Sequence, residues 1–340
     1  MKTNRLLPVA LIFVLGLVAC SSTSNTGGHL NGAESTTVKV AAAPGGIMPV
    51  SFRAAVEAGI FRKYGLDVRV QDVATGLDAI SAAVQGGVDI AYSDLFGGAA
   101  APSNGFDVGL VTPLNGTAGG NSYLLVKDDS PLQSVADLKG ATVAVGAPPL
   151  FKTLAWLILD NAGVDVKSIK WVIVPEQTTF ASRLATGQVD AAYTGSAISA
   201  EKWLADGDVR SLDDPKRLAE SIARTESAAA GFWATGAWYD ENSEIAEKFT
   251  QATTETNTWF LDLPLGEQAA HVKKQTGADP VVLDKAYPGL LQKMTVESFS
   301  SSTAPVDEAK LAAWFSVGRK YAAVPEISFD ELLLPSSRAK

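Results

Sequence analysis

Apolar residues follow two different spacings along the chain. Short apolar or alternating runs, which are typical of strands, are separated by stretches in which apolar residues recur every three or four positions, as on one face of a helix. The first strand is predicted at 38–42, and Ser51 is expected to cap a helix that ends at Gly65. Strands that alternate with helices of about 10–15 residues predict βαβ units and parallel sheets.

The same alternation continues through the rest of the chain. Further strands are predicted at 67–71, 89–92, 142–145, 169–174 and 190–193. Further helices are predicted from Gly76 onward and at 150–161 and 180–185. From Asn242 the pattern is mostly helical, and its helices are expected to pack back on one lobe, at 244–261, 265–276 and 306–321.

Two parts of this pattern resemble each other. The segment 86–93 (GGVDIAYS) recurs as 187–194 (GQVDAAYT), which matches Asp89 with Asp190. Upstream, GLDV matches GVDV, and an Ala-Pro pair after one apolar run matches an Ala-Pro pair after another. Internal similarity in a constant order predicts two lobes of one plan. The two aspartates are expected to bind backbone groups where strands begin.

Two stretches are predicted to carry the chain between the lobes. Residues 122–126 would leave the first lobe after a glycine-rich turn, and residues 231–235 would return to it. Lobe 1 is then expected to comprise 38–122 and 234–340, with the C-terminal helices, and lobe 2 to comprise 123–233. Two crossings form a hinge beside a cleft, which is a common ligand site. Either stretch could instead be an ordinary strand inside one lobe.

The N-terminal end is typical of an export signal. Lys2 and Arg5 precede an apolar run at 6–18, which is about as long as the core of a signal peptide and short for a membrane span. The run closes on Leu-Val-Ala-Cys, which is similar to the bacterial lipobox, in which a diacylglyceryl group is attached to the cysteine. Cys20, the single cysteine, would then become the lipidated N-terminus, with palmitate among its acyl chains.

Residues 1–19 are therefore predicted to be a cleaved lipoprotein signal peptide. Residues 20–37, which are rich in Ser, Gly and Asn, are predicted to be a flexible tether. An ordinary secretory leader or an N-terminal anchor helix are the alternatives. We expect the body to be lipid-anchored at the cell membrane on its extracytoplasmic face.

Composition excludes several function classes. The 37 acidic residues outnumber the 28 basic ones, which gives a formal charge of −9 and lacks the basic surface of a nucleic-acid binder. One cysteine and two histidines cannot form an intrachain disulfide, a Cys/His zinc cluster or a C-x-x-C redox pair. His29 lies in the tether and His271 in a tail helix, so a catalytic triad is not expected. We expect no metal, no cofactor and no enzymatic activity.

Three segments resemble a known family. They are AVEAGIFRKYGLDV at 55–68, GGVDIA at 86–91 and SVADLKG at 134–140, and they are similar to segments of bacterial ABC-transporter solute-binding proteins of the nitrate/sulfonate/taurine type. The resemblance covers roughly residues 38–260. It implies an α/β, bilobal periplasmic-binding-protein fold (type II) with two parallel-sheet lobes joined by two hinge crossings. A few relatives in this family synthesise pyrimidine or menaquinone precursors.

Candidate ligand-binding residues lie in the turns that follow strands. Ligands of parallel α/β sheets lie beyond the carboxyl ends of the strands, and helix N-termini there favour anions. The candidates are Pro44, Gly45, Gly46, Ile47, Gly76, Tyr92, Ser93, Asp94, Pro148, Pro149, Leu150, Phe151, Thr178, Tyr193, Thr194 and Trp233.

Each candidate also has a structural interpretation. The proline and glycine turns could be simple turn chemistry, the aromatic residues could be core, and Asp94 could cap the following helix. Tyr92 and Tyr193 are expected to face each other across the cleft as aromatic walls, or else to pack between strand and helix. Arg53 and Lys152 lie where a cation would reach an anion, or else are solvated surface charges.

The sequence predicts a solute-binding lipoprotein. We expect a monomer that captures a small organic anion or zwitterion, such as a sulfonate, a taurine-like molecule or an aromatic acid, and delivers it to ABC permease subunits. A binding protein for a pyrimidine-type or other neutral heterocycle is one alternative. A biosynthetic enzyme on the same fold and another extracytoplasmic sensor are the others.

Overall fold

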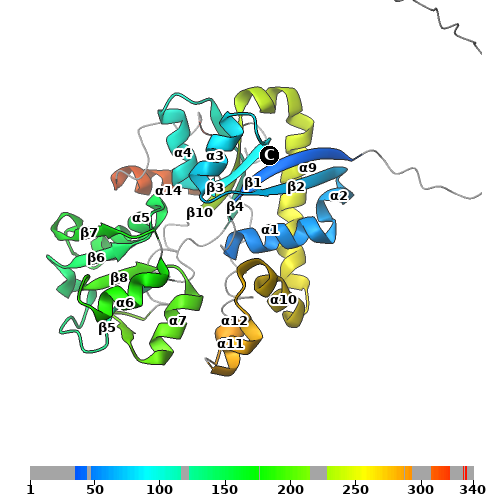
Figure 1. Cartoon of the computed structure of the whole chain (residues 1–340). Coiled ribbons are helices and arrows are strands. Elements are labelled where there is room, and N and C mark those ends of the chain that lie inside the picture. Colours follow the sequence, from blue (N-terminus) through cyan, green and yellow to red (C-terminus); the bar gives the residue numbers. More distant parts are fainter. Residues whose placement is uncertain are drawn as a thin grey trace, which may run out of the picture. The chain divides into compact units, whose positions relative to one another are not determined.

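Two five-stranded sheets with flanking helices form the body of the chain (Figure 1). The computed structural model describes residues 35–43, 47–115, 122–175, 177–214, 228–286, 288–292, 308–321, 332 and 334. All of these belong to one unit, Glu34–Lys340. The predicted signal peptide, Cys20 and most of the predicted tether lie outside the described residues.

The first sheet has the strand order β2-β1-β3-β10-β4. Its strands are β1 (Thr36–Ala42), β2 (Leu66–Asp72), β3 (Ile90–Asp94), β4 (Val108–Asn115) and β10 (Ala228–Thr235). β1 pairs in parallel with β2 and β3, as βαβ units predict. β10 runs antiparallel to both β3 and β4, so this sheet is mixed.

The second sheet has the strand order β7-β6-β8-β5-β9, which repeats the plan of the first. Its strands are β5 (Tyr123–Lys127), β6 (Thr142–Val145), β7 (Lys170–Ile173), β8 (Ala191–Thr194) and β9 (Val209–Ser211). β6 pairs in parallel with β7 and β8, and β5 is antiparallel to β8 and β9. The predicted duplication is confirmed.

The matched aspartates make the same contacts in both sheets. Asp89 accepts a hydrogen bond from Lys39 N at 2.7 Å, and its own N–H donates to Lys39 O at 3.0 Å. Asp190 accepts from Thr142 N at 2.7 Å and donates to Thr142 O at 2.8 Å. Each aspartate therefore binds the backbone at a strand entry, as the repeat predicted.

The predicted parallel sheets are wrong in one respect, because each sheet holds antiparallel strands. The chain passes from the first sheet to the second between β4 and β5, and it returns between β9 and β10. A strand that arrives from the other lobe need not follow the parallel direction that a βαβ crossover imposes. β10 lies wholly in the first sheet, so residues 228–233, which the sequence assigned to lobe 2, belong with lobe 1.

Helices cover both sheets. Those that precede β10 are α1 (Ile47–Ala58), α2 (Ile60–Lys63), α3 (Gly76–Val84), α4 (Leu95–Ser103), α5 (Pro149–Asn161), α6 (Phe180–Ala185) and α7 (Ala197–Asp206). The short 3₁₀ helices are η1 (Val135–Leu138), η2 (Val166–Ser168) and η3 (Gln177–Thr179). Those of the tail are α9 (Gly236–Asp262), α10 (Leu265–Thr276), α11 (Pro280–Ala286), α12 (Leu290–Gln292) and α14 (Glu308–Lys320).

The first helix differs from the prediction. It begins at Ile47, so Ser51 lies inside α1 and does not cap it. Gly59 interrupts the predicted helix, because its φ of +79° lies in the left-handed region, and α2 starts directly after it. Glycine adopts this conformation without steric cost, so the apolar spacing could continue through a backbone break.

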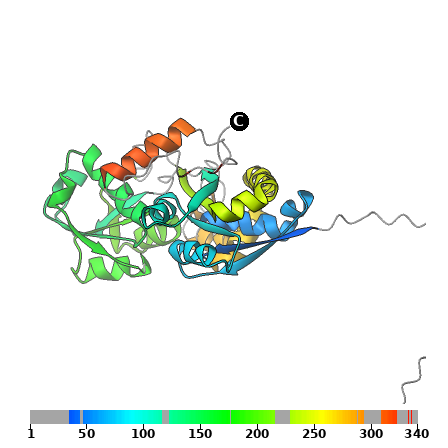
Figure 2. The same ribbon diagram turned by 90° about the horizontal axis from the view of Figure 1, so that it is seen from above.

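The last helix also differs from the prediction that the tail packs on one lobe. Trp314 of α14 stacks on Phe96 of α4, with ring centroids 5.1 Å apart. Tyr321, directly after α14, lies edge-on to Trp156 of α5 at 5.5 Å and donates a hydrogen bond to Asp160 at 2.9 Å. Lys320 also pairs with Asp160, and its hydrogen bond lowers the pKa of that carboxyl. The helix therefore bridges both lobes (Figure 2).

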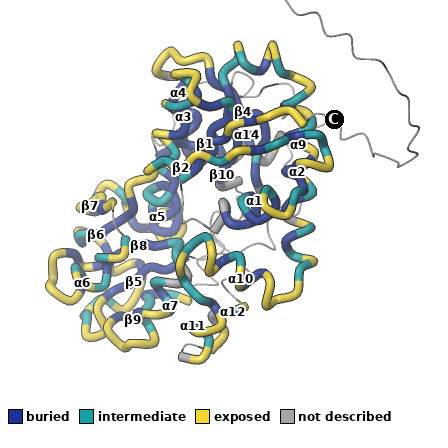
Figure 3. The backbone as a smooth tube through the Cα atoms, turned by 45° about the vertical axis from the view of Figure 1, so that its right-hand side comes forward, coloured by how far each residue is buried: buried dark blue, intermediate teal, exposed yellow. Residues whose placement is uncertain are grey.

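Both sheets are buried in hydrophobic clusters (Figure 3). One cluster joins the two lobes, since it includes Phe96 and Trp233 of the first, Leu154 and Ile158 of the second, and Trp314 of α14. Among the described residues, no helix has both the length and the apolar character to cross a membrane.

Candidate functional site

Ser93 occupies the carboxyl end of β3, where two helices of the first lobe begin. This serine is 1% exposed, and its hydroxyl oxygen has no hydrogen-bond partner among the described residues. Gly76 opens α3 against it, since a Cβ on Gly76 would lie 2.6 Å from the Ser93 Oγ. A Cβ on Gly97, in the first turn of α4, would lie 3.2 Å from the same oxygen. A buried hydroxyl without a partner is uncommon in proteins, and the two glycines pack directly against this one.

The N-terminus of α3 is built by a capping box. Thr75 Oγ1 accepts from Asp78 N at 3.1 Å, and Thr75 N donates to Asp78 Oδ2 at 2.9 Å. The first N–H groups of a helix have no partner inside it, and the capping box takes only one of them. The helix start beside Ser93 therefore supplies backbone donors at the carboxyl edge of the first sheet.

Asp94 caps α4, which is the structural role that the sequence left open. Its Oδ1 accepts from Phe96 N at 3.1 Å and from Gly97 N at 2.8 Å. Burial raises the pKa of this carboxyl, and the two backbone hydrogen bonds oppose that shift. Its Oδ2 lies 2.5 Å from the position of a Cβ on Gly97, so one carboxylate oxygen lies against the first turn of α4.

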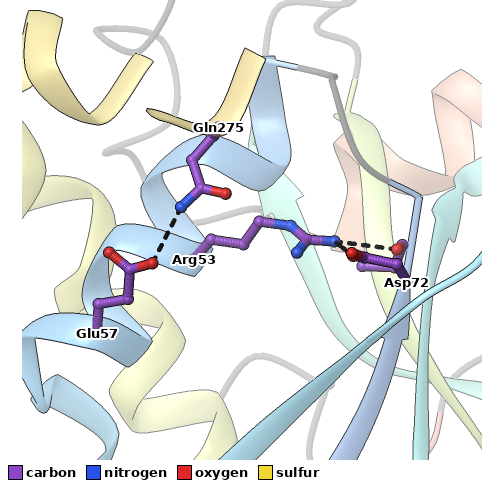
Figure 4. A network of polar contacts seen from close by, with 5 residues as sticks. Arg53, Glu57, Asp72 and Gln275 are labelled. Atoms are coloured by element: carbon purple, nitrogen blue, oxygen red, sulfur yellow. Dashed lines mark hydrogen bonds and ion pairs between the residues drawn. The ribbon is translucent and has the colours of Figure 1, made fainter. Parts of the chain in front are cut away.

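Arg53 places a cation at the same edge of the sheet (Figure 4). Its Nη2 donates to Ala42 O at the end of β1, at 3.1 Å, and to Asp72 Oδ1 at the end of β2, at 2.7 Å. Its side chain is 13% exposed and its Nε is buried without a partner. The alternative that Arg53 is a solvated surface charge is therefore wrong. Lys152 is held over the ring of Trp156, with its Nζ 4.7 Å from the ring centre.

Thr194 and Gln177 form the corresponding edge of the second sheet. Thr194, at the end of β8, is fully buried, and its Oγ1 donates to Gln177 Oε1 at 2.9 Å. The same Oγ1 accepts from Ser196 N at 3.0 Å. A Cβ on Gly146, which follows β6, would lie 2.7 Å from both Gln177 Nε2 and Phe151 Cδ2. The Gln177 amide therefore lies between the ends of two neighbouring strands.

Tyr92 and Tyr193 are buried in different hydrophobic clusters. Tyr92 lies edge-on to Phe232, with centroids 5.5 Å apart, and belongs to the cluster of β1, β3 and α1. Tyr193 is fully buried, and its hydroxyl lies 3.1 Å from Ser122 Oγ. Burial raises the pKa of both phenols. The rings thus pack inside their lobes, and a contact of either ring with a ligand stays a prediction.

The other candidates lie in several environments. Trp233 is fully buried in the cluster that joins the lobes, and its indole N–H has no partner. Pro149 begins α5 after the exposed Pro148, and Leu150 is buried in the same helix. Thr178 is exposed. Pro44, Gly45 and Gly46 lie outside the described residues, whereas the backbone of Ile47 begins α1.

Sequence reasoning missed Gln177 as a candidate, although it chose the adjacent Thr178. Gln177 lies 17 residues before Thr194. The matched serine of the repeat, Ser93, follows Gly76 by the same separation. Extending the repeat upstream of the GxVD segment that both lobes share would have selected this position.

The described polar groups at both edges offer mainly hydrogen-bond donors. They are the Ser93 hydroxyl, the first N–H groups of α3 and the Gln177 side-chain amide. No cluster of three or more His, Cys, Asp or Glu residues suited to a metal ion occurs among the described residues. These groups can donate hydrogen bonds to the oxygen atoms of a small polar molecule.

A family model accounts for most of the two lobes. Residues 50–266 match the model described as NMT1/THI5 like, which is more than half of the 340 residues. The chain belongs to the NMT1/THI5-like family. No curated protein matches the sequence of this NMT1/THI5-like chain.

Solved structures similar to this NMT1/THI5-like protein include binding proteins and an enzyme. The periplasmic aliphatic sulphonate binding protein SsuA from Escherichia coli has a TM-score of 0.68 and 18% identity, over 88% of this chain and 97% of SsuA. A Candida albicans protein with the generic periplasmic binding protein structural fold has a TM-score of 0.62 and 11% identity, over 89% and 98%. The desulfurization enzyme DSZB has a TM-score of 0.55 and 14% identity, over 88% and 96%.

These likenesses establish the fold of the NMT1/THI5-like chain. It is the α/β periplasmic-binding-protein fold with two lobes, as the sequence resemblance implied. The same fold serves binding and catalysis among these neighbours, so function has to be argued from the site.

Proposed function

We propose that this protein is an extracytoplasmic solute-binding protein. It captures a small organic anion or zwitterion, of the sulfonate, taurine-like or aromatic acid type, between the carboxyl edges of its two sheets and delivers it to the permease subunits of an ABC importer. The observation that carries this proposal is the buried hydroxyl of Ser93, which has no partner and lies at the start of α3.

The donors at this edge favour an oxygen-rich solute. A hydroxyl that is buried without a partner is destabilising, and a ligand oxygen that accepts its proton would remove that cost. The N-terminus of α3 carries a partial positive charge, and the Arg53 guanidinium lies at the ends of β1 and β2, where Asp72 pairs with it. Asp94 Oδ2, which does not take part in the two capping hydrogen bonds, would accept from the amine of a zwitterion.

The fold and its neighbours support binding with delivery to a permease. SsuA from Escherichia coli, with the same fold, is a periplasmic aliphatic sulphonate binding protein. His271 of α10, a residue that catalysis would use, packs instead against Trp259 and Phe260 of α9, with ring centroids 6.2 and 6.1 Å away. We therefore propose a binding protein rather than an enzyme.

The test of binding uses ethanesulfonate, taurine and benzoate with the purified protein. We expect at least one of them to bind, and Ser93→Ala to weaken that binding by roughly 10–150-fold, because a hydrogen bond to a charged group contributes about 1.5–3 kcal/mol. Isothermal titration calorimetry measures the affinity. Without ligand, Ser93→Ala should melt at the wild-type temperature or above it, since it removes an unpartnered polar group.

A matched control is Ser81→Ala, which changes an exposed serine of α3, the helix that begins beside Ser93. This variant should keep the wild-type affinity. Binding that is equally strong in Ser93→Ala and wild type would show that the solute lies elsewhere. Failure of all three probes to bind the wild-type protein would contradict the proposed ligand classes.

We also propose that Cys20 anchors the protein to the cell membrane by lipid after removal of residues 1–19. The sequence pattern before Cys20 supports this, since it is similar to the lipobox. In cells that express the full chain, Cys20→Ser should move the protein from the membrane fraction to the soluble fraction after detergent-free lysis. A membrane-bound Cys20→Ser protein that has lost its leader would contradict the lipid anchor.

A further inference from the structure

Gln177 and Gly76 occupy equivalent positions in the two lobes. Each precedes its matched hydroxyl residue, Thr194 or Ser93, by the same number of residues, 17. Each also touches that residue: Gln177 through a hydrogen bond, and Gly76 through its Cα, because a Cβ there would lie 2.6 Å from the Ser93 Oγ. The second lobe thus has an amide side chain at this position, whereas the first lobe has a glycine.

The contacts of Thr194 determine how the Gln177 amide is turned. Thr194 Oγ1 already accepts the N–H of Ser196, and its single proton is donated to Gln177 Oε1. If the amide were flipped, the fully buried Thr194 proton would have no acceptor, which is costly. The Oε1 of Gln177 is therefore directed at Thr194, and its Nε2 is directed away from it.

The Nε2 of Gln177 lies at the switch point of the second sheet. The chain leaves β6 for β7 on one side and reaches β8 on the other, and ligands of such sheets bind between the two strand ends. Gln177 Nε2 lies beside Gly146 at the end of β6, while Oε1 is held at the end of β8. Nε2 has no hydrogen-bond partner among the described residues, so two amide N–H donors are available there.

We propose that Gln177 is a specificity-determining residue that donates its Nε2 protons to ligand oxygens. In the second lobe, Gln177 Oε1 accepts the proton of Thr194. By the symmetry of the repeat, an oxygen of the ligand accepts the proton of Ser93 in the first lobe. Both lobes then present donors, which selects solutes that carry acceptor oxygens over isosteric solutes that carry an N–H group. This inference rests on the proposed solute-binding function, and it adds the residue that sets the selectivity.

The experiment compares two acid–amide pairs, ethanesulfonate with ethanesulfonamide and benzoate with benzamide. The wild-type protein should prefer the acid of whichever pair it binds. Gln177→Glu keeps an oxygen that can accept the proton of Thr194. It replaces the two N–H donors of Nε2 by a charged carboxylate oxygen. We expect it to weaken binding of the acid at least 100-fold and to favour the amide, so the order of preference reverses. Gln177→Ala should weaken binding of the acid about tenfold without reversing the order.

Reversal of preference separates a specificity role from a structural one, because a loosened lobe would weaken both members of a pair. Gln251→Glu, which makes the same change at an exposed position of α9, should keep the wild-type preference. Melting temperatures without probe should be close to wild type for Gln177→Glu and Gln251→Glu, whereas Gln177→Ala should melt lower, because the buried Thr194 hydroxyl loses its acceptor. Unchanged preference in Gln177→Glu, with wild-type binding intact, would overturn this inference and leave the proposed function standing. A wild-type protein that binds taurine but none of the four probes would overturn this inference alone, and one that also fails to bind taurine would overturn both.

Discussion

Replacing Trp314 by alanine is expected to lower the free energy of unfolding by about 3–5 kcal/mol. The Trp314 side chain is fully buried and stacks on Phe96 of the first lobe. It belongs to the cluster that also contains Leu154 and Ile158 of the second lobe, so the truncation leaves a cavity where both lobes meet α14. Urea unfolding followed by circular dichroism measures the change.

Two other variants make this prediction specific. Phe106→Ala removes an aromatic residue that is 48% exposed, so its effect should stay within about 0.5 kcal/mol. Trp314→Phe keeps a ring in the cluster and removes an indole N–H that has no partner, so it should cost less than the alanine variant. A Trp314→Ala protein as stable as Phe106→Ala would show that α14 does not hold the lobes.

Gly98→Ala is expected to destabilise the protein by about 1–3 kcal/mol, although alanine is the better helix former. Gly98 lies inside α4, and a Cβ there would overlap the Trp233 ring. That ring is fully buried and cannot move aside without displacing its neighbours. Thermal or urea unfolding of the variant measures the loss.

Gly266→Ala, which is the same substitution in another helix, is expected to stabilise the protein. Gly266 lies in the first turn of α10, and a Cβ there would meet no atom within 4 Å. The added methyl group should therefore stabilise the helix by up to about 1 kcal/mol. Effects of equal sign and size at both positions would show that helix propensity, rather than the contact with Trp233, decides the outcome at Gly98.

The sequence by itself determined the alternation of strands and helices and the duplication of the lobes. Helices α6 and α10 and strand β6 have the predicted bounds. These features are local, because a strand or helix shows its buried face in the spacing of neighbouring apolar residues. The strand-entry role of Asp89 and Asp190 could be predicted for a similar reason, since the same short motif occurs twice.

Only the tertiary structure decided which segments meet. Examples are the antiparallel pairing of β5 and β10, the bridging position of α14 and the hydrogen bond between Gln177 and Thr194. These contacts join residues far apart in the chain, so the spacing of apolar residues within one element cannot predict them. Burial likewise placed Tyr193 inside its lobe, because an apolar strand position looks the same in sequence whether it faces a core or a ligand. Local periodicity therefore identified the sheet edges that we propose as the binding site. Long-range packing decided which side chains at those edges still have a free donor.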